Sequence, residues 1–345
     1  MLKFENELAD ASARRGLHNA AAMLTALLSF AAGTGPAAAS ATFTTIDVSG
    51  AADTYSIAIN AGGSVTGQYT DESAINHGFV RTADGTITSF DPKGSTDTSA
   101  VSINTSGAVA GYYNDSKGVT HGFLRSSSGK ITRIDPKGST DTQVLGVNDG
   151  GSVTGYYVDS LFAAHGFVRA SDGTTIVFDP KNSIDTQSNG INAKGAVAGY
   201  FTDSSGASHG FLRDSKGTIT SFDVPGSADT YPFAINGKGA IAGFYVHGET
   251  VSGFVRAADG TIQTFDPKGS DATEVYGIND KGTTTGFDYP NSALHGFQRT
   301  SKGKIKQFDP PNSTSTEPWN INDSGAIVGQ YTDGNGIDHG FIRTP

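Results

Sequence analysis

The sequence has no cysteine, only two methionines and a single tryptophan. The absence of cysteine excludes disulfides, thiolate metal sites and cysteine nucleophiles. Charged residues are also sparse, at 17%, and the formal net charge is −10. A field of that sign repels phosphate backbones and anionic lipids, so we expect neither nucleic acid nor a membrane surface as a partner.

Helical periodicity and familiar catalytic motifs are missing as well. No segment after residue 41 repeats every 3.6 residues, so helices should be nearly absent. No catalytic triad, Walker loop, dinucleotide fingerprint or His-Glu-x-x-His motif occurs. The chain of 345 residues, 36% of them hydrophobic, is nevertheless long enough to bury a sizeable core. A globular protein without an evident catalytic signature is therefore expected.

The first 41 residues differ in composition from the rest. Arg14 and Arg15 precede an uncharged run over 20–32, and Ala39-Ser40-Ala41 places small residues where a signal peptidase cleaves. The run is too short to span a bilayer comfortably. We expect residues 1–41 to be a Sec or loose twin-arginine signal peptide, with a membrane anchor or a disordered tail as alternatives. The mature chain, 42–345, would then be periplasmic, cell-surface or extracellular, with no membrane span.

Three short patterns recur seven times along the rest of the chain. A hydrophobic residue followed by aspartate recurs at Asp47, Asp91, Asp135, Asp179, Asp223, Asp266 and Asp309. An Ile-Asn or Val-Asn pair follows each time, at Asn60, Asn104, Asn148, Asn192, Asn236, Asn279 and Asn322. A Gly-Phe-x-Arg unit comes next, ending at Arg81, Arg125, Arg169, Arg213, Arg256, Arg299 and Arg343. Repeats of this length indicate a solenoid or a propeller.

One repeat reads as four short strands separated by turns rich in glycine. In the second repeat we expect strands at Ala100–Asn104, Ala108–Tyr113, Thr120–Ser126 and Lys130–Asp135, from their alternating, β-branched or aromatic residues. Four strands per repeat in seven repeats predict an all-β, seven-bladed β-propeller with four antiparallel strands per blade. A parallel β-helix would need shorter repeats, and separate sandwiches would need longer ones.

The two ends of the mature chain complement each other. The seventh repeat stops after its third strand, and the unpartnered segment Phe43–Asp47 opens the mature chain. Pairing this segment with His339–Arg343 would complete the last blade and remove two exposed sheet edges. We therefore expect the N-terminal strand to close the ring.

The Gly-Phe unit is preceded by histidine in six repeats, as in His121-Gly122-Phe123. This pattern resembles the bacterial extracellular HAF-type repeats, named for a His-Ala-Phe core, and covers essentially the whole mature chain. The resemblance implies export and a β-propeller-like array of repeats. It implies no particular activity.

Residues kept in every repeat are better explained by the blade than by a site. The hairpin register predicts a hydrogen bond between His121 and Asp135, and one between His339 and Asp47 across the closure; Ser252 replaces histidine in the fifth repeat. We expect the repeated arginines to stack on a neighbouring blade and the repeated asparagines to cap turns. The alternatives are a ring of catalytic or metal-binding histidines, and an arginine face that binds an anionic polymer.

Residues that depart from the repeat are the candidates for function. Those expected around the mouth of the central channel are Tyr55, Gln143, Gln187, Tyr231, Phe233, Glu274, Tyr276, Glu317 and Trp319. Irregular loops in the fifth and sixth repeats add His247, Glu249, Asp288 and Tyr289. Aromatic and acidic side chains at a concave mouth are suited to a sugar or peptide. The alternative is that these residues only pack between blades.

A short acidic loop is the one candidate for a metal. Asp333, Asn335 and Asp338 alternate like the first ligands of a calcium loop but lack the closing glutamate. A plain turn is favoured, so we expect no metal and no cofactor, with calcium as the alternative.

These observations favour an exported, monomeric, non-enzymatic scaffold that binds a sugar, peptide or protein on the loop face. One alternative is an extracellular hydrolase or lyase that uses His247, Glu249, Glu274, Glu317 or Asp288. Another is a cell-surface structural or adhesive protein. The fold alone does not decide between them.

Overall fold

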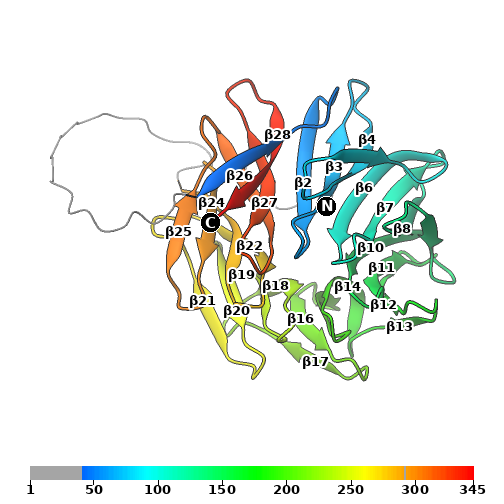
Figure 1. The fold of residues 1–345 in the computed structure, drawn as a ribbon. Helices are drawn as coiled ribbons and strands as arrows, with labels where there is room; N and C mark the ends of the chain where they lie inside the picture. Colours follow the sequence, from blue (N-terminus) through cyan, green and yellow to red (C-terminus); the bar gives the residue numbers. More distant parts are fainter. Residues whose placement is uncertain (1–40, 291–292) are drawn as a thin grey trace. The chain divides into compact units, whose positions relative to one another are not determined.

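A computed structural model describes residues 41–290 and 293–345, and every regular element in those ranges is a β-strand. The strands form seven separate antiparallel sheets of four strands each, which follow one another around a ring (Figure 1). The predicted seven-bladed β-propeller is confirmed. The expected signal peptide, up to Ser40, lies outside the described residues.

Each blade consists of an innermost, a second, a third and an outer strand. The innermost strands of blades 1 to 7 are β2 (Asp53–Ile59), β6 (Ser95–Ile103), β10 (Asp141–Val147), β14 (Ser183–Ile191), β18 (Asp229–Ile235), β22 (Thr273–Ile278) and β26 (Ser315–Ile321). The second strands are β3 (Val65–Thr70), β7 (Val109–Asp115), β11 (Val153–Val158), β15 (Val197–Asp203), β19 (Ile241–His247), β23 (Thr284–Asp288) and β27 (Ile327–Thr332).

The third and outer strands complete the blades. The third strands are β4 (Asn76–Arg81), β8 (Thr120–Arg125), β12 (Ala164–Arg169), β16 (Ser208–Arg213), β20 (Thr250–Arg256), β24 (His295–Arg299) and β28 (Asp338–Thr344). The outer strands are β5 (Ile87–Phe90), β9 (Ile131–Ile134), β13 (Thr175–Phe178), β17 (Ile219–Phe222), β21 (Ile262–Phe265), β25 (Ile305–Phe308) and, in blade 7, β1 (Thr42–Ile46).

The ring is closed by β1, as predicted. This strand pairs antiparallel with β28, with Phe43 opposite Arg343 and Ile46 opposite Gly340. Figure 1 shows the two strands, from opposite ends of the chain, side by side in one sheet. The closure therefore covers the edge of β28 with backbone hydrogen bonds from the first strand of the chain.

The inner strands are longer than expected and irregular. In blade 2 the strand starts at Ser95 instead of Ala100 and stops before Asn104. Its register with β7 shifts between Ala100 and Ser102, and the same kind of bulge interrupts the innermost strand of every blade. A bulge leaves one residue without a partner and turns its side chain out of the regular alternation.

The bulge explains one repeated glycine on the second strand. A methyl group on Gly155 would overlap the carbonyl oxygen of Gln143, which the bulge pushes towards β11. Equivalent overlaps arise in all the other blades, at Gly67, Gly111, Gly199, Gly243, Gly286 and Gly329. Glycine is therefore required at this position by close backbone approach.

The core lies between successive blades. The phenylalanine of each Gly-Phe-x-Arg unit is fully buried, at Phe79, Phe123, Phe167, Phe211, Phe254, Phe297 and Phe341. Phe123 packs edge-on against Phe90 on the outer strand of the preceding blade, with ring centroids 5.9 Å apart. The guanidinium of Arg125 lies 4.8 Å from the centre of the same Phe90 ring. The prediction that the repeated arginines stack on a neighbouring blade is confirmed here.

The repeated asparagines join the blades into a closed ring. In each blade the side-chain oxygen accepts a hydrogen bond within its own turn, as when Ser152 N–H donates to Asn148 Oδ1 over 3.0 Å, so the predicted cap is confirmed. The side-chain amide of Asn148 also donates to the carbonyl oxygen of Asn192 in the next blade, over 3.1 Å. The same bond continues around the ring, and Asn322 returns it to Asn60 over 3.0 Å.

Candidate functional site

Three of the candidate side chains occupy the bulges of consecutive inner strands. Phe233, Tyr276 and Trp319 are the unpaired residues at the bulges of blades 5, 6 and 7. The equivalent residues of blades 1 to 4 are aliphatic or amide, namely Ile57, Val101, Leu145 and Asn189. The repeat therefore keeps the bulge in every blade and places aromatic rings on it in only one part of the ring.

These three rings form a continuous aromatic wall. The ring centroids of Phe233 and Tyr276 are 4.8 Å apart, and those of Tyr276 and Trp319 are 4.7 Å apart, both edge to face. Phe287 on β23 stacks on Tyr276 and meets Trp319 edge-on, while Phe244 on β19 stacks on Phe233. Phe233 and Tyr276 remain partly exposed, whereas Trp319 is buried. We call Phe233, Tyr276, Trp319, Phe244 and Phe287 the aromatic wall.

Carboxylates are fixed to this wall by hydrogen bonds. The Tyr276 hydroxyl donates to Glu274 Oε2 over 2.5 Å. Burial, and then the charge of Glu274, raises the pKa of the Tyr276 hydroxyl well above its ordinary value, so it stays a donor. Trp319 Nε1 donates to Gln330, whose amide donates in turn to Glu317 Oε2, each over 3.3 Å. Glu274 is therefore held directly by the aromatic wall, and Glu317 is held through Gln330, which accepts a hydrogen bond from Trp319.

The remaining predicted residues lie on the inner strands of other blades. Gln143 and Gln187 are opposite Tyr156 and Tyr200 on their second strands, and Tyr231 meets Tyr200 edge-on at 5.0 Å. Burial raises the pKa of the Tyr55 hydroxyl, and so do the charges of its neighbours Asp338 and Asp53. The inner strands outside the aromatic wall therefore carry tyrosine hydroxyls and glutamine amides.

Of the candidates expected in irregular loops, His247 and Glu249 share one exposed turn, whereas Asp288 lies in strand β23, next in sequence to Phe287 of the aromatic wall. His247 ends β19 in an exposed turn, and its Nδ1 is 2.6 Å from the carbonyl oxygen of Gly226 in the connection that enters the same blade. Glu249 is exposed in the same turn. Asp288 is fully buried in β23, opposite His295 on β24. The structure therefore does not bring His247 and Asp288 together.

The acidic loop of blade 7 is an ordinary turn. Asp333 Oδ1 accepts hydrogen bonds from the backbone N–H groups of Asn335 and Ile337, over 2.8 and 3.0 Å. Asp338 Oδ1 accepts one from Thr332. The same turn occurs in blades 1 to 4. Within the described ranges, no group of three or more histidine or acidic side chains is arranged to hold a metal ion.

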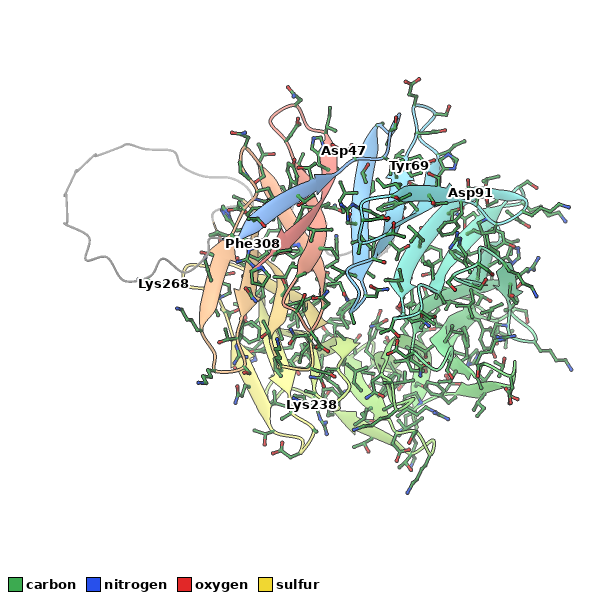
Figure 2. All side chains as sticks on the ribbon, viewed as in Figure 1. Asp47, Tyr69, Asp91, Lys238, Lys268 and Phe308 are labelled. Atoms are coloured by element: carbon green, nitrogen blue, oxygen red, sulfur yellow. The ribbon has the colours of Figure 1, made fainter. Side chains whose placement is uncertain are left out.

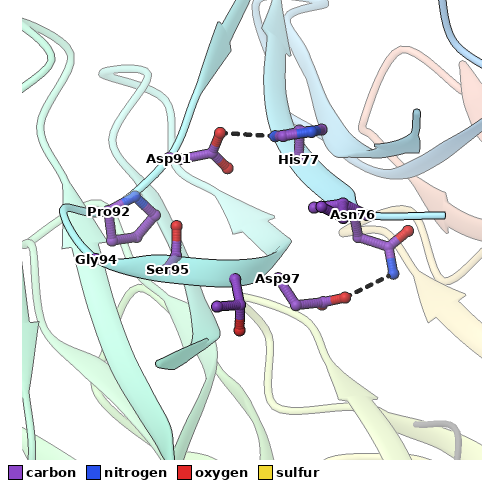
Figure 3. A pocket seen from close by; sticks show the side chains of 9 residues that line it. Asn76, His77, Asp91, Pro92, Gly94, Ser95 and Asp97 are labelled. Carbon is purple, nitrogen blue, oxygen red and sulfur yellow. Dashed lines mark hydrogen bonds and ion pairs between the residues drawn. The ribbon is translucent and has the colours of Figure 1, made fainter. Parts of the chain in front are cut away.

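The predicted histidine–aspartate pairs are confirmed. His77 Nδ1 lies 2.7 Å from Asp91 Oδ2, and Figure 3 marks this contact with a dashed line. His121 and His339 lie 3.1 and 2.8 Å from Asp135 and Asp47. In the fifth blade the Ser252 hydroxyl donates to Asp266. These pairs join the third and outer strands of each blade, and they account for the repeated histidines structurally.

Sequence reasoning missed a second carboxylate beside most of these histidines. Asp71 Oδ2 lies 3.4 Å from His77 Nε2, so the ring lies between two acids. The same arrangement recurs in four other blades, with Asp115, Asp159, Asp203 and Asp333. The signal was present, because each of these aspartates stands at the same spacing before its histidine, but the turn that brings it back was not anticipated.

Comparisons with known proteins support the fold and do not assign a function. No family model and no curated protein matches the sequence. In the part of the chain that the structure describes, no helix is long and apolar enough to cross a bilayer.

Several solved propellers are similar in structure. Virginiamycin B lyase from Staphylococcus aureus is 16% identical, with a TM-score of 0.60 over 89% of this chain and 100% of that one. A streptogramin B lyase is 15% identical, with a TM-score of 0.56 over 88% and 98%. The β-propeller domain of the Trilobed protease from Pyrococcus furiosus, which has an open velcro topology, is 11% identical, with a TM-score of 0.58 over 84% and 95%. At these identities the likeness establishes a β-propeller fold and no shared activity.

Proposed function

We propose that this protein is an exported, non-enzymatic scaffold that binds a sugar at the channel mouth of blades 5 to 7. The observation that supports this most is the aromatic wall, in which Phe233, Tyr276 and Trp319 are in contact across three consecutive blades. Aromatic faces with nearby fixed polar groups are the usual makeup of a small-molecule site. Blades 1 to 3 carry aliphatic residues at the same positions.

The polar groups of the wall favour a ligand rich in hydroxyl groups. Glu274 and Glu317 supply acceptors; the Tyr276 hydroxyl holds Glu274, and the Gln330 amide holds Glu317. The net charge of −10 disfavours an anionic ligand. A neutral or cationic saccharide, which stacks on rings and donates hydroxyl hydrogen bonds, matches this chemistry better than a polyanion does.

Export is part of the proposal. Arg14-Arg15, the apolar run 20–32 and Ala39-Ser40-Ala41 support it, as does the resemblance to HAF-type repeats. Cleavage after Ala41 would leave β1 intact, because that strand begins at Thr42. We expect the secreted form, sequenced from its N-terminus, to begin near Thr42. A start beyond Ile46 would contradict this part of the proposal, since β1 is needed to complete blade 7.

A glycan array probed with the full chain tests the binding proposal. We expect a saccharide hit that does not require calcium. Trp319→Ala should weaken it roughly thirtyfold, because Trp319 packs against the partly exposed Tyr276 and loss of this buried aromatic support costs about 2 kcal/mol. Tyr276→Phe, which removes the hydroxyl that donates to Glu274, should weaken binding less.

The matched control is Phe162→Ala, which removes an aromatic ring that is 88% exposed on the turn between β11 and β12. It should leave binding unchanged. Thermal unfolding of each variant separates a lost site from a lost fold. Absence of any saccharide hit, or equal effects of Trp319→Ala and Phe162→Ala, would contradict the proposal.

A further inference from the structure

Exposed apolar side chains gather in blade 3. Among the described residues, seven large hydrophobic side chains are exposed, and two of them, Ile75 and Ile337, belong to turns of blades 1 and 7. The other five fall within one short stretch of blade 3 and the start of blade 4: Leu161, Phe162, Ile176, Val177 and Ile184. Hydrophobic residues scattered singly over a surface need no explanation, whereas a group in one blade indicates an interaction surface.

The outer strand β13 gives this surface a free edge. Within the described part of the chain, β13 pairs only with β12, and Figure 1 shows it on the outer rim of the ring. The N–H of Ala170 donates to the carbonyl oxygen of Thr174 over 2.8 Å, which fixes the alternation of the ladder. The backbone N–H and C=O groups of Ile176 therefore face β12, and those of Thr175 and Val177 face outwards.

The side chains of β13 differ from those of the other outer strands. Ile176 stands opposite Val168, and the residue at its position is polar or charged in the other six blades: Thr44, Thr88, Thr132, Thr220, Gln263 and Lys306. Val177 likewise stands where the other blades have Thr45, Ser89, Arg133, Ser221, Thr264 and Gln307.

This difference removes a protection that the other blades keep. Polar and charged residues on an edge strand discourage pairing with another chain. In blade 6, for example, Lys306 stands two residues before Phe308, which Figure 2 labels at the end of β25. Ile176 and Val177 are instead 50% and 44% exposed, and burial against another strand would remove that apolar surface from water.

The edge of β13 is complementary to itself. When two copies pair antiparallel about a two-fold axis at Ile176, Thr175 of each copy faces Val177 of the other, so their outward backbone groups form hydrogen-bonded pairs. Ile176 then faces Ile176 of the second copy in a non-hydrogen-bonded pair, where side chains approach most closely. Val168 lies beside Ile176 on the same face of its own sheet. A row of four aliphatic side chains would therefore cross the interface.

We propose that the protein forms a symmetric dimer in which the two β13 strands pair and join blade 3 of each copy into one continuous sheet. The second copy fits this edge because both the outward backbone groups and the apolar centre find matching partners in the same four residues. No charged residue occurs in β13, so pairing brings no like charges together within the strands. This dimer departs from the monomer expected from the sequence, and it uses no residue of the aromatic wall.

The proposed dimer is weak, for two reasons. An edge of four residues falls short of the roughly 800 Å² per partner that a stable complex buries. Each copy also carries a formal net charge of −10, so the copies repel each other. We therefore expect a dissociation constant on the order of 10⁻⁵ to 10⁻⁴ M. Added salt should strengthen the dimer, because it screens the repulsion between the copies.

Analytical ultracentrifugation of the full chain, from about 1 μM to about 0.5 mM, tests the proposal. We expect a monomer–dimer equilibrium that shifts towards the dimer between about 0.05 and 0.3 M NaCl. Ile176→Lys, which copies Lys306 of blade 6, should weaken dimerisation at least about tenfold, because two ammonium groups would face each other. Thr220→Lys, the control, places the same charge at the equivalent position of β17 and should leave dimerisation unchanged within about twofold.

An introduced cysteine tests the register of the pairing. The chain has no cysteine of its own, and the two residues of a non-hydrogen-bonded antiparallel pair are close enough for a disulfide. Ile176→Cys, oxidised with diamide at the concentrations where the dimer forms, should therefore give a covalent dimer. The matched variant Thr220→Cys should give at least about tenfold less of it.

Four outcomes would overturn the proposal. They are a monomer at every concentration tested, equal effects of Ile176→Lys and Thr220→Lys, growth into oligomers larger than a dimer, and equal crosslinking of the two cysteine variants. Ile176→Thr combined with Val177→Ser reproduces two residues that blade 4 already has, Thr220 and Ser221. Loss of the dimer in this double variant, with its thermal unfolding unchanged, would support the proposal even if Ile176→Lys failed to fold.

Discussion

The two ends of the innermost strands differ in how closely they follow the repeat. At one end every strand is followed by an asparagine, such as Asn148, whose side chain bonds to the next blade, and the bonds close into a ring. At the other end the residues change from blade to blade, from Gln143 in blade 3 to Glu274 in blade 6. The two ends share the same strands and the same bulges.

This difference separates framework from candidate site. A residue that the ring needs in seven equivalent places is fixed by geometry, as Gly155 is fixed by the carbonyl oxygen of Gln143. A residue that packs only with its own neighbours, as Tyr276 does with Trp319, is free to differ. The departures cluster in blades 5 to 7, which is why we place the proposed sugar site there.

The most damaging single change should be Gly155→Ala. The new methyl group would overlap the carbonyl oxygen of Gln143, which is a backbone atom and not the end of a flexible side chain. We expect a loss of about 3 kcal/mol or more in the free energy of unfolding, measured in urea. Gly334→Ala is the control, because nothing lies within 4 Å of its added methyl. Equal stability of the two variants would mean that the bulge is not rigid.

Breaking the asparagine ring should have the next largest effect. Asn148→Ala removes the bond to Asn192 and the cap on Ser152 N–H. We expect a loss of about 2 kcal/mol in unfolding free energy, because a buried hydrogen bond between two blades is lost and the Ser152 N–H loses its partner. The exposed Asn335→Ala should cost less than about 0.5 kcal/mol. Similar losses in the two variants would show that the ring bonds add nothing.

Stacking of the arginines on the neighbouring blade should have a smaller effect on stability. The chain contains its own control, because one arginine faces an aliphatic residue in place of phenylalanine. Arg213 lies 4.9 Å from the ring centre of Phe178, whereas the outer residue facing Arg169 is Ile134. Phe178→Ile should cost about 1–2 kcal/mol, from the lost cation–π and aromatic pairs. A double-mutant cycle with Arg213→Met isolates the pair. A coupling energy near zero would leave Arg213 with a packing role only.

The smallest expected effect is a shift of stability with pH. Burial lowers the pKa of His77, His165, His209 and His339, but hydrogen bonds and charge from their carboxylates outweigh it, so each pKa is raised. Their contribution is therefore complete below the unfolded value of about 6.5 and is lost as pH rises through the folded value.

The aspartates on the other side of these histidine rings set the lower pH limit of highest stability. Hydrogen bonds from Ser205 lower the pKa of Asp203 to about 2, so its contribution is present above the unfolded value near 4 and is lost on acidification. We expect stability to be highest between about pH 4 and 6.5 and to decline towards pH 8. His209→Gln should flatten that decline slightly in urea unfolding, and an unchanged slope would contradict the assignment.

The architecture followed from the sequence because it rests on local patterns repeated seven times. Strand count, blade count and the pairing of Phe43 with the last repeat needed only the spacing and the missing fourth strand. The bond between His121 and Asp135 followed from the loop length alone. Each of these depends on residues within one hairpin or on the count of repeats.

The sequence indicated the position of the candidate residues on the inner strands, but not the contacts between their side chains. Position on the inner strand grouped Phe233, Tyr276 and Trp319, and the structure places these rings in contact. Their contacts arise from bulges, which depend on backbone geometry and cannot be predicted from residue type. The amide bonds of Asn148 reach another blade, so they require the closed ring. The irregular loop of His247 resembled a site, yet its side chain contacts the carbonyl of Gly226.

Hydrogen–deuterium exchange of the full chain, with and without the saccharide that binds best, tests most directly whether the departures from the repeat form the site. We predict that protection on binding is confined to β18, β22, β26 and their second strands β19, β23 and β27, and is absent from the asparagine turns. Protection spread evenly over all seven blades, or confined to blades 1 to 4, would contradict it.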